Sequence, residues 1–395
     1  MEQAIRKPEK SFPDEVLIDI LLRLPVDLLA TLRYKSKTWL RLLANNSHLI
    51  KLHMERSNPI IIAVDPPSHN NHFTQIYCIE DYTSCKPVTL NPQFQNLGCF
   101  AVSGSSHGVL CITKTREYTS CSSQHSDVYL WNPLTNEKLT IQCSPIRSDI
   151  PLNSDDCQAV FGFGFLEDAT VCKVLRAVYV LDCARSKLLR SHVSIYNVCN
   201  ASWKDLPDLS TSEIHDICPL DPPATVNESL HWIAARSDDY YDKILCFNLK
   251  EETFQVMPSP IVGESVYIDD SFIGNPYVHV RELSGQLCIF GNPPNENLEL
   301  WVMKEYGVAD SWTKLLKIGG SFRHLRPIGV ASSGEIILMK DTEKYQQLAL
   351  YNAETKTVKK ASNKILFPRL DFVHNLTQSL VSVKSMQLVE SELLD

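Results

Sequence analysis

The sequence has no long hydrophobic run, and none of its apolar stretches approaches the roughly 18 residues that a membrane-spanning helix needs. Residues 1–10 also lack the apolar core of a secretory signal peptide. These two absences predict a protein of the cytoplasm, with the nucleus as the alternative compartment, and no membrane partner.

Clustered cysteines are missing as well. The 13 cysteines are scattered from Cys78 to Cys288 without one C-x-x-C pair. An odd number of unclustered cysteines is typical of reduced, mostly buried thiols rather than of a disulfide framework. His69 and His72 lack further ligands at the spacing of a zinc site. We therefore expect no metal and no other cofactor.

Positive charge is in short supply, because 38 Lys and Arg residues face 46 Asp and Glu residues, for a formal net charge of −8. A nucleic-acid-binding protein needs a basic face to displace counterions from phosphate, so we expect no nucleic-acid partner. An acidic surface suits a basic protein partner and equally aids solubility. With 395 residues, 44% of them hydrophobic, the chain has the length of two folded domains, or of a small module and a large domain.

Complete catalytic motifs are absent too. Residues 104–108 formally satisfy the G-x-S-x-G pattern of hydrolases, whose serine stands between a strand and a helix. Here the apolar segment 109–112 follows, which has the pattern of a strand. Residues 161–165 contain a G-x-G without a third glycine, which is weak evidence for a dinucleotide site. We expect a protein that is not an enzyme, with a serine hydrolase using Ser106 and His107 as a minor alternative.

Residues 13–53 have helical patterning. Apolar residues recur at helical spacing between Val16 and Leu24, and Pro13 suits a first helical turn because it lacks an N–H. Pro25 ends this helix, and two further short helices are expected around Leu29 and Trp39. Three helices in about forty residues cannot bury this many leucines internally. The remaining apolar surface must pack against the following domain or against another protein.

From residue 60 onward the pattern changes to short strands separated by turn residues. One unit recurs, in which an apolar strand is followed by a second strand that ends in an aromatic residue and Asn. The aromatic-Asn copies end at residues 132, 197, 248 and 352, and a copy without the Asn lies at 298–302. Paired strands repeating about every fifty residues are typical of propeller blades of kelch-like length. A large β-sandwich is the alternative fold.

The N-terminal segment resembles an F-box, which is carried by the following residues: Phe12-Pro13-Asp14-Glu15, Leu17, Ile20-Leu21, Arg23-Leu24-Pro25-Val26, Leu29, Arg33, Ser36-Lys37 and Trp39. F-box modules bind the Skp-type adaptor of cullin-based ubiquitin ligases. The resemblance therefore implies adaptor-binding positions, some of which pack the helices together while others contact the adaptor: Pro13, Leu17, Ile20, Leu24, Pro25, Leu29 and Trp39. Thr31, Leu32, Tyr34 and Lys35 depart from the residues usual in the family.

The rest of the chain resembles the plant F-box-associated domain. The matching stretches, in the order of that family, are 104–111, 131–135, 161–165, 173–174, 196–197 and 202–203. Residues 300–308, followed by Ser311-Trp312, are most similar to S-locus F-box proteins and their relatives. The resemblance implies an F-box at 11–55 and a substrate-recognition domain, a kelch-like β-propeller, at 56–390.

These resemblances imply the substrate-recognition subunit of a Skp–cullin–F-box ubiquitin ligase, which holds a target protein near the ubiquitin-charged enzyme. The S-locus resemblance suggests a basic style ribonuclease as the target in pollen self-incompatibility. We expect the target to contact the polar loops 115–127, 147–158 and 238–243, because recognition is usually carried by loops on a rigid framework. The alternative from another class is a propeller that acts as a scaffold or binding protein without docking to a ligase.

Overall fold

The structure is a computed structural model, and its described residues are 14–44, 46–57, 59–65, 75–81, 84–88, 100–114, 127–150, 157–166, 171–181, 188–209, 216–217, 222–235, 243–261, 278–291, 298–318, 325–331, 333–341, 346–360, 366–367 and 372–387. None of the helices in this part of the chain has the length and apolar character needed to cross a membrane. Within the same residues, no three His, Cys, Asp or Glu side chains are grouped so that they could hold a metal ion.

Four short helices form the N-terminal module, which we call the helical module. They are α1 (Asp14–Leu22), α2 (Val26–Leu32), α3 (Lys37–Ala44) and α4 (Ser47–Arg56). Pro25 separates α1 from α2, as its missing N–H and fixed φ predict. The sequence predicted three helices. The fourth, α4, follows its N-cap residue Asn46, whose side-chain Oδ1 accepts a hydrogen bond from the Leu49 backbone N–H at 2.9 Å.

The described strands form six antiparallel sheets. The first sheet contains β26 (Phe372–Thr377), β1 (Pro59–Asp65), β2 (Gln75–Asp81) and β3 (Ser84–Val88). The second contains β4 (Phe100–Ser106), β5 (Val109–Lys114), β6 (Val128–Asn132) and β7 (Glu137–Ile141). The third contains β8 (Cys157–Phe165), β9 (Cys172–Leu181), β10 (Leu188–Asn197) and β11 (Ser202–Leu206). The fourth sheet contains β12 (Asp216–Ile217), β13 (Ala224–Val226), β14 (Ser229–Ala235), β15 (Lys243–Asn248) and β16 (Thr253–Pro258). The fifth contains β17 (Val278–Leu283), β18 (Gln286–Gly291), β19 (Leu298–Met303) and β20 (Trp312–Ile318). The sixth contains β21 (Leu325–Val330), β22 (Ile336–Asp341), β23 (Gln346–Asn352), β24 (Thr357–Lys360) and β25 (Leu366–Phe367).

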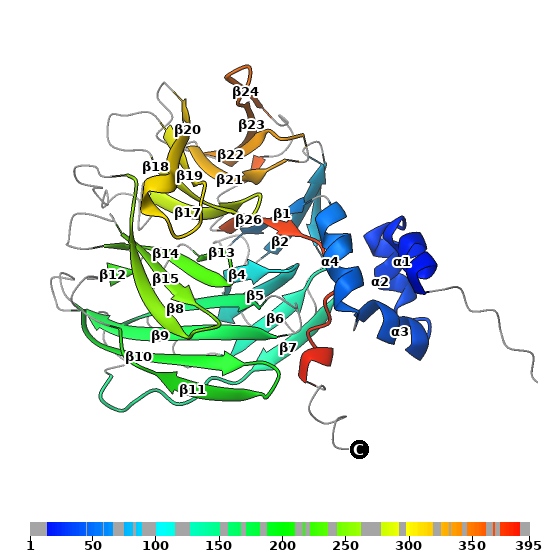
Figure 1. Ribbon diagram of the computed structural model, residues 1–395, viewed down its shortest axis with the longest axis horizontal. Coiled ribbons are helices and arrows are strands. Elements are labelled where there is room, and N and C mark those ends of the chain that lie inside the picture. The colour runs from blue at the N-terminus through cyan, green and yellow to red at the C-terminus, as the bar shows by residue number, and fades with distance from the viewer. Residues whose placement is uncertain are drawn as a thin grey trace, which may run out of the picture.

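The six sheets are the blades of a β-propeller (Figure 1). The inner strands follow one another around the ring, and β26 lies between β21 of the last blade and β4 of the second. Because β26 comes from the C-terminal end of the chain and pairs with β1, the first blade is built from both ends of the sequence and closes the ring. The prediction of a small helical module followed by a β-propeller is confirmed, and the alternative of a large β-sandwich is wrong.

The aromatic-Asn motif marks the end of the third strand in four blades. The Asn side chain accepts hydrogen bonds at 2.7–3.3 Å from backbone amides two or three residues later, in the turn that leads to the fourth strand, and this holds for Asn132, Asn197, Asn248 and Asn352. The last residue of each turn then has φ between 51° and 56°. The repeat in the sequence is therefore a repeat of one turn. In this turn the Asn side-chain oxygen serves as the hydrogen-bond acceptor for the backbone N–H groups.

Gly108 connects β4 to β5 at φ +76°, and a Cβ there would lie 2.6 Å from Ser379 Oγ and 2.8 Å from the Ser379 amide nitrogen. Gly285 has nearly the same conformation, φ +78°, with nothing within 4 Å. We expect Gly285→Ala to lower the free energy of unfolding by about 1–2 kcal/mol, the cost of the left-handed conformation. Gly108→Ala should cost clearly more, because it adds the clash with Ser379. Urea unfolding of both variants checks this, and equal losses would contradict the close contact.

His231 on β14 is fully buried, and its two ring nitrogens contact the Ala224 carbonyl at 3.1 Å and the Tyr306 hydroxyl at 3.0 Å. Since a carbonyl only accepts, Nδ1 carries the proton and Nε2 accepts from Tyr306. Burial lowers the pKa of His231 to about 4, from the usual 6.5. The unfolded chain thus binds a proton at a higher pH than the folded chain, so stability is lost as the pH falls from 6.5 to 4.

We therefore expect the free energy of unfolding to fall between pH 6.5 and pH 4, with His231 contributing on the order of 3 kcal/mol of that fall. His231→Gln should flatten the dependence over this window, whereas His48→Gln, at an exposed position on α4, should leave it unchanged. Denaturant unfolding at several pH values provides the measurement. An unaltered slope in His231→Gln would show that the ring is protonated without cost in the folded protein.

Candidate interaction site on the helical module

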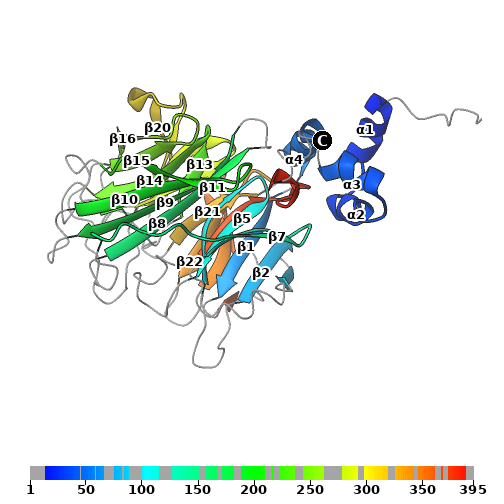
Figure 2. The same cartoon turned by 90° about the horizontal axis from the view of Figure 1, so that it is seen from below.

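The helical module lies at one side of the propeller (Figure 1). In both views α4 lies nearest the propeller, and α1, α2 and α3 lie farther out (Figure 2). The chain leaves the module at Arg56, the end of α4, and enters β1 at Pro59, so the covalent link between the two parts is very short. The module therefore has an inner side that packs against the propeller and an outer side that does not.

The inner side is apolar and fully buried. It contributes to a single hydrophobic cluster that joins the module to the second and third blades and to the C-terminal end of the chain. The members from the module are Leu21, Leu29, Ala30, Leu43, Leu49 and Ile50, and those from the rest of the chain include Val109, Leu130, Phe163, Val174, Leu380 and Val381. Part of the apolar surface that the short helices cannot bury among themselves is thus covered by the protein's own propeller.

The outer side keeps large apolar residues in solvent. Val16 and Ile20 on α1 are each 44% exposed, as is Leu28 on α2, and Leu40 on α3 is 40% exposed. We call these four residues the exposed apolar face. Val16 and Ile20 are four residues apart and so share one side of α1. Five of the nine large hydrophobic residues that are exposed within the described chain belong to the helical module, although the module is a small part of it. Such a concentration is typical of a protein-binding surface.

The seven residues predicted to bind an adaptor separate into groups. Ile20 and Pro25 are exposed, whereas Leu29 is completely buried in the cluster with the propeller. The other three described positions are half-buried and pack against that cluster: Leu17, Leu24 and Trp39. Pro13 lies outside the described residues. The structure thus brings Ile20 to the outer side and places Leu29 in the interior, a distinction that helical spacing does not make.

Three residues of the exposed apolar face were not among the predicted positions: Val16, Leu28 and Leu40. The i, i+4 relation of Val16 to Ile20 was the sequence signal for the first of them. Leu28 and Leu40 had no such signal, because their exposure depends on which sides of α2 and α3 the propeller covers.

Exposed charged side chains lie on the same helices as the exposed apolar face. Glu15 and Asp19 lie on α1, and Lys37 and Arg41 lie on α3; all four are exposed. Asp19 forms an ion pair with Arg23 at 2.8 Å, and both side chains are more than half exposed, so the pair adds little stability. Exposed apolar side chains together with charged ones are usual in a protein–protein interface.

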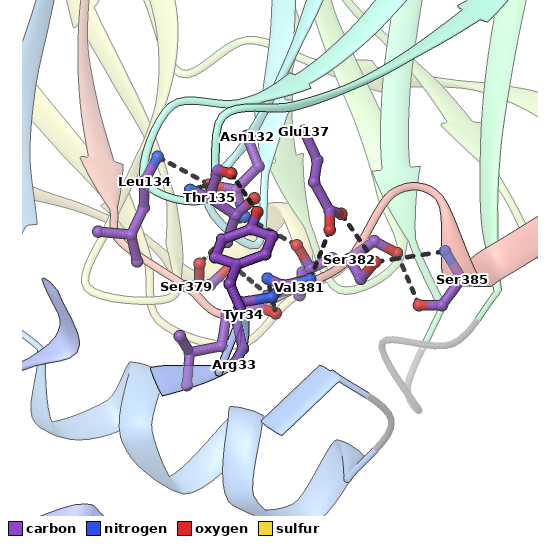
Figure 3. A network of polar contacts seen from close by, with 11 residues as sticks. Arg33, Tyr34, Asn132, Leu134, Thr135, Glu137, Ser379, Val381, Ser382 and Ser385 are labelled. Atoms are coloured by element: carbon purple, nitrogen blue, oxygen red, sulfur yellow. Dashed lines mark hydrogen bonds and ion pairs between the residues drawn. The ribbon is translucent and has the colours of Figure 1, made fainter. Parts of the chain in front are cut away.

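A polar joint connects α2 to the second blade (Figure 3). Arg33 follows the last residue of α2, and its fully buried guanidinium donates to Glu137 of β7 at 2.6 Å. Next to it the Tyr34 hydroxyl donates to the Thr135 carbonyl at 2.7 Å. We call these four residues the polar joint. Tyr34, one of the departures from the usual F-box residues, thus contacts the propeller, whereas Lys35 is exposed.

The serine of the hydrolase-like motif lies in a β-hairpin. Ser106 is the last residue of β4, and after the turn the chain continues directly into β5. The helix whose N-terminus would stabilise an oxyanion is therefore not at this position. Ser106 Oγ lies 2.9 Å from His107 Nδ1. Burial and the nearby Lys51 lower the pKa of His107 to about 4, which makes its imidazole a weak general base at neutral pH.

The loops predicted to contact a target lie largely outside the described residues, which include only 127, 147–150, 157–158 and 243 of them. The strand ends next to these loops are described. Val128 is at one end of β6, and Asn132, in the turn beside the polar joint, is at the other. Val128 therefore lies at the end of the blade away from the helical module.

Residues 69–383 match the family described as the F-box associated beta propeller domain. Among curated proteins, the F-box protein At3g07870 of Arabidopsis thaliana is 28% identical, and the match covers 78% of this chain and 73% of that protein. The F-box/kelch-repeat protein At3g23880 of the same plant is 24% identical, with coverage of 87% and 88%. The F-box protein CPR1, also from Arabidopsis thaliana, is 24% identical, with coverage of 84% and 79%.

Proposed function

Because this chain belongs to the F-box associated β-propeller family, we propose that it is the substrate-recognition subunit of a Skp–cullin–F-box ubiquitin ligase. The helical module binds the Skp-type adaptor and, through it, the cullin scaffold. The propeller binds the target protein. The names of the relatives, all of them F-box proteins, support the same role.

The observation that carries this proposal is the exposed apolar face of α1, α2 and α3. The propeller already covers the inner side of the same helices, so the outer side is what remains for another molecule. Burying a fully exposed large aliphatic side chain contributes roughly 1.5–3 kcal/mol. These four side chains are 40–44% exposed, so each contributes about half of that at most, as the apolar part of a larger interface. Ile20 and Pro25 are the predicted positions that contact the adaptor, together with Val16, Leu28 and Leu40.

The subunit acts by proximity and makes or breaks no bond itself. Holding a target on the propeller while the adaptor is bound to the module turns ubiquitin transfer into a reaction within one complex. The effective concentration of target lysines near the ubiquitin-charged enzyme then depends on the distance and orientation of the two binding sites.

The target binds at the end of the blades opposite the helical module. The strand ends that flank residues 115–126 and 236–242 are at the far ends of their blades from the Asn132 and Asn248 turns. The net charge of −8 favours a basic target. A basic style ribonuclease, the target suggested by the S-locus resemblance, has this chemistry.

Isothermal titration of the full chain with a purified plant Skp-type adaptor tests the proposal. We expect a 1:1 complex that also assembles with the cullin and supports ubiquitin transfer in a reconstituted reaction. A folded full-length chain that binds no adaptor would overturn the proposal and would favour a propeller that serves as a scaffold or binding protein.

A further inference from the structure

The last described segment of the chain lies between the helical module and the propeller. After β26, residues 378–387 leave the ring and run beneath the module, ending in a short 3-10 helix, Ser385–Gln387. We call residues 378–387 the C-terminal tail. Six of the nine side chains between 378 and 386 are buried: Ser379, Leu380, Val381, Ser382, Val383 and Met386. The apolar ones belong to the cluster that also contains the inner side of the module.

Hydrogen bonds hold the tail from both sides. On the propeller side, the side-chain Nδ2 of Asn132 donates to the carbonyls of Ser379 at 3.0 Å and Val381 at 2.8 Å. On the module side, the Arg33 guanidinium donates to the Leu380 carbonyl at 3.3 Å. The tail backbone therefore bridges the two parts of the protein.

The tail also completes the polar joint. One carboxylate oxygen of Glu137 accepts from Arg33, and the other accepts from the Ser382 hydroxyl at 2.7 Å. The carboxylate thus links α2, the second blade and the tail at a single buried point (Figure 3). The three linked residues are far apart in the sequence, so their meeting depends on the position of the module on the propeller.

A module attached to the propeller only through residues 57–59 would be able to turn about that link. Apolar contacts resist separation but have no strong directional preference. Hydrogen bonds and the buried ion pair are directional, and they satisfy their partners in one arrangement. The polar joint is a second attachment, on α2, at a different place from the covalent link on α4. Two separate attachments remove the freedom to turn.

We infer that the polar joint and the C-terminal tail fix the orientation of the helical module on the propeller, and that Arg33 and Glu137 are positioning residues for ubiquitin transfer. The inference rests on the proposed function for its consequence, because orientation decides which lysines come within reach of the ubiquitin-charged enzyme. The fixed orientation itself is a property of this chain alone.

Distance measurement by pulsed electron resonance tests the orientation directly. Spin labels are introduced as non-canonical amino acids, because the chain has 13 cysteines, at Thr38 on α3 and at Lys356 in the β23–β24 turn, both exposed. The wild-type protein should give one narrow distance distribution. Arg33→Met combined with Glu137→Leu removes the ion pair without leaving a buried charge, and it should broaden the distribution or add a second population.

A matched control is available inside the propeller. Lys173 and Glu252 form a mostly buried ion pair at 2.8 Å that does not touch the module. Lys173→Met combined with Glu252→Leu should leave the distance distribution unchanged. Ser382→Ala is a milder variant that keeps the ion pair and removes only the bond from the tail; it should broaden the distribution less than the double variant. A distribution that stays narrow in a folded Arg33→Met, Glu137→Leu protein would overturn the inference.

A second readout concerns ubiquitin transfer, with the lysines of the chain itself as the acceptors. In a reconstituted ligase, mass spectrometry of the wild-type chain should find a restricted set of modified lysines, and the double variant should spread modification over more of them while keeping adaptor affinity. Loss of the proposed function appears as no modification of the wild-type chain at all, and the distance measurement remains valid in that case. Failure of the inference appears as the same lysine pattern in both proteins.

Discussion

Ile20→Asp is expected to weaken binding of the Skp-type adaptor by about 100-fold, which corresponds to roughly 2.7 kcal/mol. Ile20 is 44% exposed on the outer side of α1, so the substitution introduces a charge into the exposed apolar face. A carboxylate buried in an apolar interface without a partner loses its hydration, and the complex cannot restore it. The fold should tolerate the change, because solvent reaches this position in the free protein.

Two matched variants separate binding from folding. Leu189→Asp makes the same kind of change at a position on the third blade that is 53% exposed, and it should leave adaptor affinity unchanged. Leu29→Ala should affect stability rather than adaptor affinity. Leu29 is fully buried in the cluster that joins the module to the propeller, and its truncation should cost about 2–5 kcal/mol of stability. Titration calorimetry measures affinity, and urea unfolding measures stability. Wild-type affinity in a folded Ile20→Asp protein would place the adaptor elsewhere.

Glu137→Leu is expected to lower the free energy of unfolding by about 3–5 kcal/mol, because it leaves the Arg33 guanidinium buried without its counter-charge. The Arg33 side chain has no exposure to solvent, and the Glu137 side chain is only 10% exposed. Glu137→Leu also removes the acceptor of the Ser382 hydroxyl in the C-terminal tail. A loss of this size would exceed that from most single surface substitutions.

Arg33→Met added to Glu137→Leu should recover most of the lost stability, since an apolar pair of similar volume replaces a buried ion pair at little net cost. The comparison for an exposed pair is Asp19→Ala, which breaks the Asp19–Arg23 contact on α1 and should cost no more than about 1 kcal/mol. Urea unfolding of the four proteins completes the measurement. If Glu137→Leu were no worse than Asp19→Ala, the Arg33 guanidinium would have to reach water or another acceptor.

Much of the propeller was predictable because its signal is local. The Asn side chains that end the third strands bond to amides two or three residues away, so the same short motif appears wherever that turn is made. Gly108, Gly285 and Gly334 have φ between 76° and 80° in the turns before second strands, which is again a local requirement. Such features recur along the chain in several of the blades.

The first blade was not predictable by the same reasoning. It combines β26 from the end of the chain with β1, β2 and β3 from near the beginning, and the aromatic-Asn motif is missing from its third strand, β2. The blade number, six, therefore follows only once the ring is closed. The fourth helix was missed for a related reason: its buried residues Leu49, Ile50 and His53 face the rest of the fold, and alternating polar residues such as Lys51 obscure the apolar pattern.

The sequence by itself determined that short helices with surplus apolar residues precede a repeated β domain, because helical and strand periodicity and the Asn turns are properties of neighbouring residues. Only the tertiary structure decided which of those apolar residues are left for a partner. Ile20 and Leu29 are both apolar residues of predicted helices, yet Leu29 is buried in the cluster shared with the propeller and Ile20 stays in solvent. Arg33 and Leu380 are 347 residues apart and meet only when the ring has closed and the tail has passed beneath the module. Burial and ion pairing between distant segments depend on the whole fold, and no local pattern records them.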